Sequence, residues 1–104
     1  MAWLILVIAG LLEVVWAVGL KYSEGMTKFW PSVGTVITLL LSFWLLGIAM
    51  RSLPVGTAYG VWVGIGAVGT VIFGIFFLGE AAGLYRMLSV MLILIGIVGL
   101  KITA

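Results

Sequence analysis

Four long apolar runs fill most of this 104-residue chain and decide what it can fold into. A helix of about 20 residues rises about 30 Å, which matches the hydrocarbon core of a bilayer. We therefore predict four transmembrane helices, at about 3–20, 30–50, 55–78 and 84–102. Hydrophobic residues make up 65% of the chain and charged residues only 8%, so the composition excludes an ordinary soluble domain. The sequence predicts an all-α, multi-pass membrane protein.

The segments between the apolar runs are short and leave no room for a domain outside the membrane. We predict a single four-helix transmembrane domain covering residues 1–104. No basic segment precedes the first run, so we expect no cleavable signal peptide. The chain has no cysteine and no histidine, and we predict no metal site and no cofactor. Its few charges are dispersed and offer no basic patch for nucleic acid.

Glu13 is the one ionisable residue inside the first run. Counted from Trp3, it lies roughly 15 Å into the helix, close to the middle of the bilayer. Inserting a carboxyl group there costs about 3 kcal/mol or more, so such a residue indicates function by default. The alternative is a neutral glutamate capped by a neighbouring helix. Burial opposes the charged form and hydrogen-bond donors favour it, so the group can hold either a proton or a cation.

Several side chains on the first three helices could surround this carboxyl group. Trp16 lies one turn away on the same face. Gly10 is on this face too, and its small size leaves space beside the carboxyl group. Ser42 lies at a similar depth in the second helix, although hydroxyl groups often bond back to their own helix. The third helix offers Tyr59 and Trp62, of which Tyr59 could be only an interface anchor. We predict that these five residues support the site.

Small residues in the third and fourth helices are predicted to serve helix bending and subunit packing. In the third helix, Gly64 and Gly66 lower the cost of bending, so we predict a bend there. The fourth helix brings no acid or base to the membrane interior, and we predict that it assembles subunits, with lipid contact alone as the alternative. The residues predicted to pack at the dimer contact are Ser89, Leu92, Gly96 and Gly99.

The charges in the loops give little preference for one orientation in the membrane. Lys21, Lys28 and Arg86 would face one side, and Arg51 and Lys101 the other. This difference is too small for the positive-inside rule to fix the orientation. The chain could insert in one orientation only, or in both. Larger transporters use inverted repeats for alternating access, and this chain contains no repeat. Two copies inserted in opposite orientations would take the place of the two inverted repeats and bring two carboxyl groups to one site.

Two segments resemble the small multidrug resistance family, and the resemblance extends over the whole chain. They are EVVWAVGLKYS at 13–23 and AYGVWVGIG at 58–66. The part from Trp16 through Thr27 is similar to the guanidinium exporter subtype and unlike the quaternary ammonium subtype. The resemblance implies an antiparallel, dual-topology homodimer in the bacterial inner membrane that exports guanidinium ion in exchange for protons. It also implies that Glu13 binds both proton and substrate, supported by Trp16, Ser42, Tyr59 and Trp62, and that the fourth helix forms the dimer contact.

These observations predict a transporter and no enzyme activity. The predicted function is a proton-coupled antiporter that exports guanidinium ion and small guanidinyl compounds by alternating access. A planar guanidinium ion fits a carboxylate through two parallel hydrogen bonds and stacks on tryptophan. The alternatives are an exporter of hydrophobic quaternary ammonium compounds, a small cation channel and a purely structural membrane subunit. The expected partners are the cation, protons, the lipid bilayer and a second, inverted copy of the chain.

Overall fold

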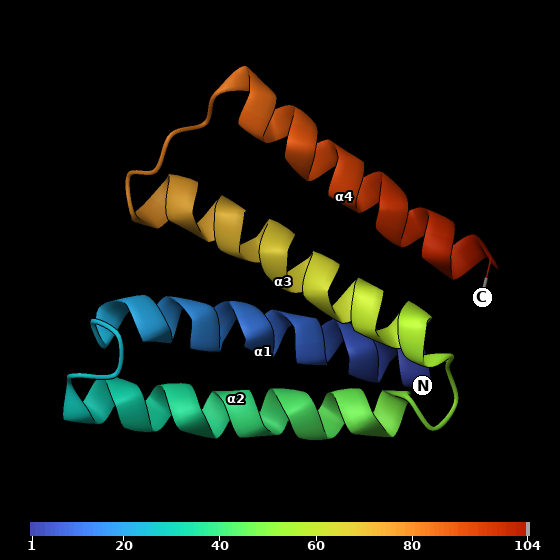
Figure 1. Cartoon of the computed structure of the whole chain (residues 1–104), viewed down its shortest axis with the longest axis horizontal. Helices are drawn as coiled ribbons and strands as arrows, with labels where there is room; N and C mark the ends of the chain where they lie inside the picture. The colour runs from blue at the N-terminus through green and yellow to red at the C-terminus, as the bar shows by residue number, and fades with distance from the viewer. Residues whose placement is uncertain (104) are drawn as a thin grey trace.

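Four α-helices make up the chain in a computed structural model that describes residues 1–103 (Figure 1). They are α1 (Ala2–Tyr22), α2 (Phe29–Ala49), α3 (Val55–Phe77) and α4 (Leu84–Thr103). All four are long and apolar enough to cross a membrane, which confirms the predicted all-α class with four spans. Helix α1 continues past position 20 to Tyr22, and Lys21 lies in its last turn, where a cation interacts favourably with the helix dipole.

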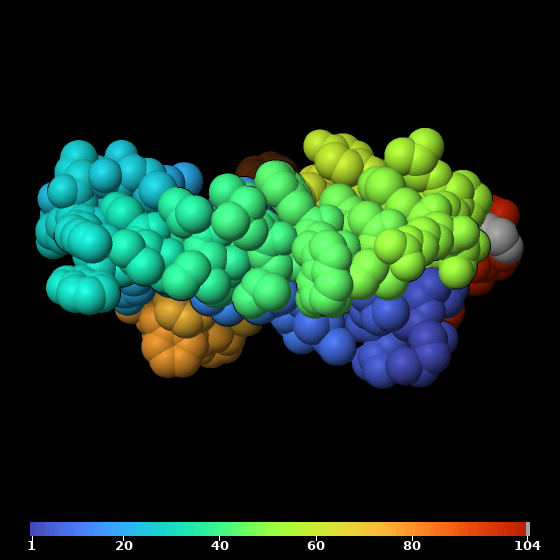
Figure 2. All heavy atoms as spheres, turned by 90° about the horizontal axis from the view of Figure 1, so that it is seen from below, coloured from blue at the N-terminus to red at the C-terminus, as the bar shows by residue number. Residues whose placement is uncertain are grey.

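The helices form a thin assembly with few internal contacts. Helices α1 and α2 make an antiparallel hairpin, α3 crosses α1, and within residues 1–103 helix α4 packs against α3 alone. The assembly measures 40 × 34 × 17 Å, and in the view of Figure 2 helix α2 covers most of the face seen from below. Much apolar surface therefore stays exposed. Helix α4 is the extreme case, because Val90 is its one buried residue.

The buried core lies where α1, α2 and α3 meet, near the N-terminus of α1. It combines a few large side chains with small ones that let the helices approach closely. Its members are Leu6, Ala9, Leu46, Ala49, Ala58, Val61 and Trp62. At the opposite end of the hairpin, a Cβ on Gly19 would lie 3.5 Å from Thr35 Cβ and would overlap its hydroxyl oxygen. The hairpin is thus held closely at both ends.

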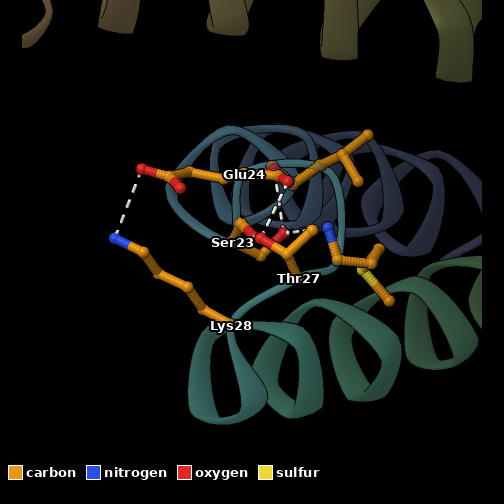
Figure 3. A network of polar contacts seen from close by, with 6 residues as sticks. Ser23, Glu24, Thr27 and Lys28 are labelled. Carbon is orange, nitrogen blue, oxygen red and sulfur yellow. Dashed lines mark hydrogen bonds and ion pairs between the residues drawn. The ribbon is translucent and has the colours of Figure 1, made fainter.

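The loop between α1 and α2 is fixed by the buried Ser23 (Figure 3). Ser23 Oγ donates to the Leu20 carbonyl at 2.8 Å and accepts the Met26 N–H at 2.9 Å. Lys28 and Glu24 form an exposed ion pair of 3.4 Å. Three consecutive residues adopt positive φ angles, namely Glu24 (51°), Gly25 (73°) and Met26 (74°). These local bonds compensate for the left-handed backbone of two non-glycine residues and reverse the chain tightly.

The loops place the charged residues at two ends of the assembly. Figure 1 shows the α1–α2 loop and the α3–α4 connection at one end, with the N-terminus and the α2–α3 loop at the other. Lys21, Lys28 and Arg86 therefore lie toward the first end, and Arg51 toward the second. Helices α1 and α3 diverge toward the first end (Figure 1), and the candidate site lies between them on that side.

Candidate functional site

An open groove runs between α1 and α3 and continues onto the α3–α4 connection. Its volume is about 380 Å³. Helices α1 and α3, Glu80 of the connection and Arg86 at the start of α4 form its walls, and one side is open. The residues that line it are Glu13, Trp16, Ala17, Val63, Gly66, Ala67, Thr70, Val71, Glu80 and Arg86. We call this the Glu13 groove. It contains the carboxylate singled out from the sequence and two further charged groups.

The Glu13 side chain lies directly on Gly66 of α3. A Cβ at position 66 would lie 2.7 Å from Glu13 Cγ and would overlap the carboxylate itself. The neighbouring Gly69 accommodates Val14, whose Cγ2 would lie 2.5 Å from a Cβ there. One glycine face of α3 therefore receives α1. No hydrogen bond or ion pair within residues 1–103 involves the Glu13 carboxylate, which leaves its oxygens available to a ligand.

Trp16 lines the same groove one turn along α1 from Glu13. Its indole N–H is buried and has no hydrogen-bond partner among residues 1–103. A buried donor without an acceptor costs about 1–3 kcal/mol, and proteins rarely retain one without a use. The structure thus places an unpaired donor and an unpaired carboxylate along one wall.

Ser42 and Trp62 bind each other, and Ser42 in turn binds the α1 backbone; neither side chain bonds to Glu13. Trp62 Nε1 donates to Ser42 Oγ at 2.9 Å, and Ser42 Oγ donates to the Ala9 carbonyl at 2.8 Å. In an α-helix that carbonyl also accepts the N–H four residues on, which belongs to Glu13. The pair therefore ties α2 and α3 to the helical turn that carries Glu13.

Tyr59 packs against Trp62 and is 54% exposed. Its ring centroid is 5.8 Å from that of Trp62, and the Phe43 ring lies 5.4 Å from the same indole. Such tilted aromatic pairs favour one ring orientation. Tyr59 and Phe43 thus hold Trp62, and Phe43 is a residue that sequence reasoning did not select.

Gly10 and Gly64 are helix contacts and do not line the groove. A Cβ on Gly10 would lie 2.7 Å from Ile65 Cβ, and one on Gly64 would lie 2.9 Å from Ile97 Cγ1. Gly10 thus brings α1 onto α3, and Gly64 brings α3 onto α4. Helix α3 is continuous from Val55 to Phe77 in this structure, and the bend at Gly64 and Gly66 stays a prediction.

The residues predicted for dimer packing lie along the exposed side of α4. Leu92 is 70% exposed, and a Cβ on Gly96 or Gly99 would meet nothing within 4 Å among the described residues. Ser89 is also exposed, and its hydroxyl donates to the Tyr85 carbonyl of its own helix at 2.9 Å. Spacings of three and four residues place these positions on one face. This face remains uncovered in the single chain.

Sequence reasoning missed the charged residues at the end of the groove. Arg86 Nη2 lies 2.7 Å from Glu80 Oε1, and both side chains line the groove that contains Glu13. Thr70 lines it between them and Glu13. One signal was available: Gly66, Thr70 and Gly74 recur every four residues and so share a face of α3.

Four membrane-length helices beside one acidic groove define a small multi-pass membrane protein. The family described as Small Multidrug Resistance protein matches residues 1–93. The chain belongs to this family, as the resemblance in the sequence had indicated.

Bacterial relatives match the chain along nearly its whole length, and they carry the name Guanidinium exporter. The Yersinia pseudotuberculosis protein is 62% identical over 104 residues, covering 100% of both chains. The Escherichia coli K12 protein is 61% identical over 103 residues, covering 99% of this chain and 98% of its own. The Proteus vulgaris protein is 55% identical over 104 residues, again covering 100% of both. Family and relatives together indicate a bacterial membrane transporter.

Proposed function

We propose that this protein is a proton-coupled antiporter that exports guanidinium ion and small guanidinyl compounds. The observation that carries the proposal is the Glu13 carboxylate, which lies on Gly66 in an open groove with no cationic partner among residues 1–103. The names of the full-length relatives support the choice of cation.

The groove suits a planar cation because of the groups beside Glu13. The two carboxylate oxygens can accept two parallel N–H bonds from a guanidinium ion. The Trp16 indole lies on the same wall and offers a π face to the cation, while its N–H, a donor, serves only an acceptor such as a carboxylate oxygen. Val63 and Ala67 complete an apolar wall on α3, which removes water and strengthens the charge interaction.

Proton coupling follows from having one carboxylate for two cationic ligands. A carboxylate in a low-dielectric groove needs a compensating positive charge, which either a proton or a guanidinium ion supplies. The two ligands cannot occupy the same oxygens together. Each bound guanidinium ion therefore displaces a proton, and opposite movement of the two produces antiport.

Alternating access requires a second copy of the chain in our proposal. The Glu13 groove is open on one side, and the α4 face of Ser89, Leu92, Gly96 and Gly99 is uncovered. An antiparallel homodimer would close the groove and cover that face. It would also bring two Glu13 residues to one site and provide the inverted halves that larger transporters carry as repeats. We place this dimer, with residues 1–104 of each copy as one transmembrane domain, in the bacterial inner membrane.

A comparison of two cations in liposomes tests the substrate. We expect a proton gradient to drive uptake of guanidinium and not of a bulky quaternary ammonium dye. Transport of the dye alone would favour the quaternary ammonium alternative. Guanidinium current that a proton gradient cannot drive uphill would favour a channel.

Labelling of the termini tests the orientation. A tag on the C-terminus should be accessible from both sides of the membrane in a dual-topology protein. Accessibility of every copy from one side only would remove the antiparallel dimer.

A further inference from the structure

Two carboxylates lie on the same face of α3, each packed on a glycine. Glu13 lies on Gly66, and Glu80 lies on Gly74, where a Cβ would be 2.6 Å from Glu80 Cδ and 3.1 Å from Oε2. Eight residues separate the two glycines, which corresponds to about 12 Å along the helix. Thr70 stands halfway and lines the same groove. The groove thus contains a carboxylate at each of two positions along α3, with the Thr70 hydroxyl group between them.

Glu80 already binds a guanidinium group in this structure. The Arg86 guanidinium donates to Glu80 Oε1 at 2.7 Å, while the Glu80 N–H donates to the Gly74 carbonyl at 3.0 Å. The backbone bond fixes Glu80 at the end of α3, independently of Arg86. The side chains of Arg86 and Glu80 are 37% and 34% exposed, so the pair lies at a partly exposed end of the groove. A guanidinium ion that enters the groove from this end would therefore meet a carboxylate that already binds a guanidinium group.

We propose that Glu80 is a second guanidinium-binding carboxylate, at the outer end of the Glu13 groove. Arg86 occupies it at rest, and a free guanidinium ion replaces Arg86 during passage. This inference rests on the proposed function and names a further binding residue for the same substrate. Because Arg86 is tethered on α4 and carries the same chemical group as the substrate, it acts as a built-in competitor. Its return to Glu80 releases the ion, either to water or past Thr70 toward Glu13.

An inverted dimer would give each membrane face one such pair. In every copy Glu80 and Arg86 lie at the same end of the helices as the α1–α2 loop. Two copies in opposite orientations would therefore present these residues on opposite faces of the membrane. Loading and release would then use the same device. A structural ion pair that only anchors the α3–α4 connection is the competing explanation, and the two make different predictions.

Binding of guanidinium to the Glu13→Gln variant tests the second site directly. The measurement is line broadening of ¹³C-labelled guanidinium by the purified full-length protein. We expect Glu13→Gln to retain weak binding, and Glu13→Gln with Glu80→Gln to weaken it by about tenfold or more, as expected for loss of a charge-assisted bidentate bond. Equal binding by both variants, or none by Glu13→Gln, would overturn the inference.

Transport kinetics separate a binding role from an anchoring role. We expect Glu80→Gln to raise the KM for guanidinium about tenfold with little change in kcat. Arg86→Gln should lower the KM, because it removes the competitor. Glu24→Gln is the matched control, since it breaks an ion pair at the same end but outside the groove, and should leave the KM unchanged.

The outcomes distinguish this inference from the function on which it rests. If Glu80→Gln and Arg86→Gln raise the KM alike, the Glu80–Arg86 ion pair only anchors the α3–α4 connection, and the proposed second binding site is refuted. If the unmodified protein transports no guanidinium, the proposed function falls first and the second site falls with it.

Discussion

Replacing Gly66 with alanine places a methyl group where the Glu13 side chain lies. The added Cβ would be 2.7 Å from Glu13 Cγ, whereas ordinary contact begins near 3.4 Å. Glu13 must therefore move by about 0.7 Å at Cγ, and by more at the carboxylate, whose oxygen the Cβ would overlap. A displacement of about 1 Å at a reacting or binding group can cost about 10²-fold in rate. We expect guanidinium transport in liposomes to fall by that order.

The same substitution should not unfold the protein. Alanine favours a helix over glycine by about 1 kcal/mol, so α3 itself gains stability. Gly56→Ala is the matched control on the same helix, because a Cβ there meets nothing within 4 Å among the described residues. Thermal unfolding in detergent should leave both variants folded, with transport lost only in Gly66→Ala. Equal transport by the two variants would refute the placement of Glu13 on Gly66.

Three further substitutions test the site and the assembly. Glu13→Asp withdraws the carboxylate by roughly 1 Å, so we expect guanidinium to bind but transport to slow about 10²-fold; an unchanged rate in liposomes would contradict a tightly positioned group. Ser42→Ala leaves the buried Trp62 N–H without its acceptor, and unfolding in detergent should show a loss of about 1 kcal/mol, while wild-type stability would argue against the bond. Gly96→Trp fills the exposed α4 face, and cross-linking should then detect fewer dimers; an undiminished yield would remove that face as the contact.

The helices could be predicted from the sequence because the membrane leaves few choices. A run of about 20 apolar residues must satisfy its backbone internally, and a helix does so. The relation of Glu13 to Trp16 followed from the same geometry, since residues three apart share a helix face. Both line the groove in the structure.

Contacts between helices were harder to derive, and Ser42 shows why. Its depth matches that of Glu13, but depth defines a level in the membrane and not a partner. The partner depends on how closely α2 approaches α1, and the small Ala9 lets the Ser42 hydroxyl reach its carbonyl. Helix periodicity contains no information on that approach.

Glu80 and Arg86 were missed for a related reason. In the sequence Glu80 belongs to a short polar connection and Arg86 to the first turn of the predicted fourth helix, at a membrane surface where charged residues usually face water. Their place in the groove depends on the chain reversal at Gly79, whose φ is +70°, and on the space left by Gly74. These are features of backbone path, which apolar periodicity does not encode.

Guanidinium uptake driven by a proton gradient, with and without Glu13, tests the central claim most directly. Liposomes containing the unmodified protein should accumulate guanidinium against its concentration gradient when a proton gradient is imposed, and should move protons the opposite way. Liposomes with Glu13→Gln, folded to the same extent, should do neither. Uphill uptake by Glu13→Gln at the unmodified rate would contradict the assignment of Glu13 as the shared site for guanidinium and protons.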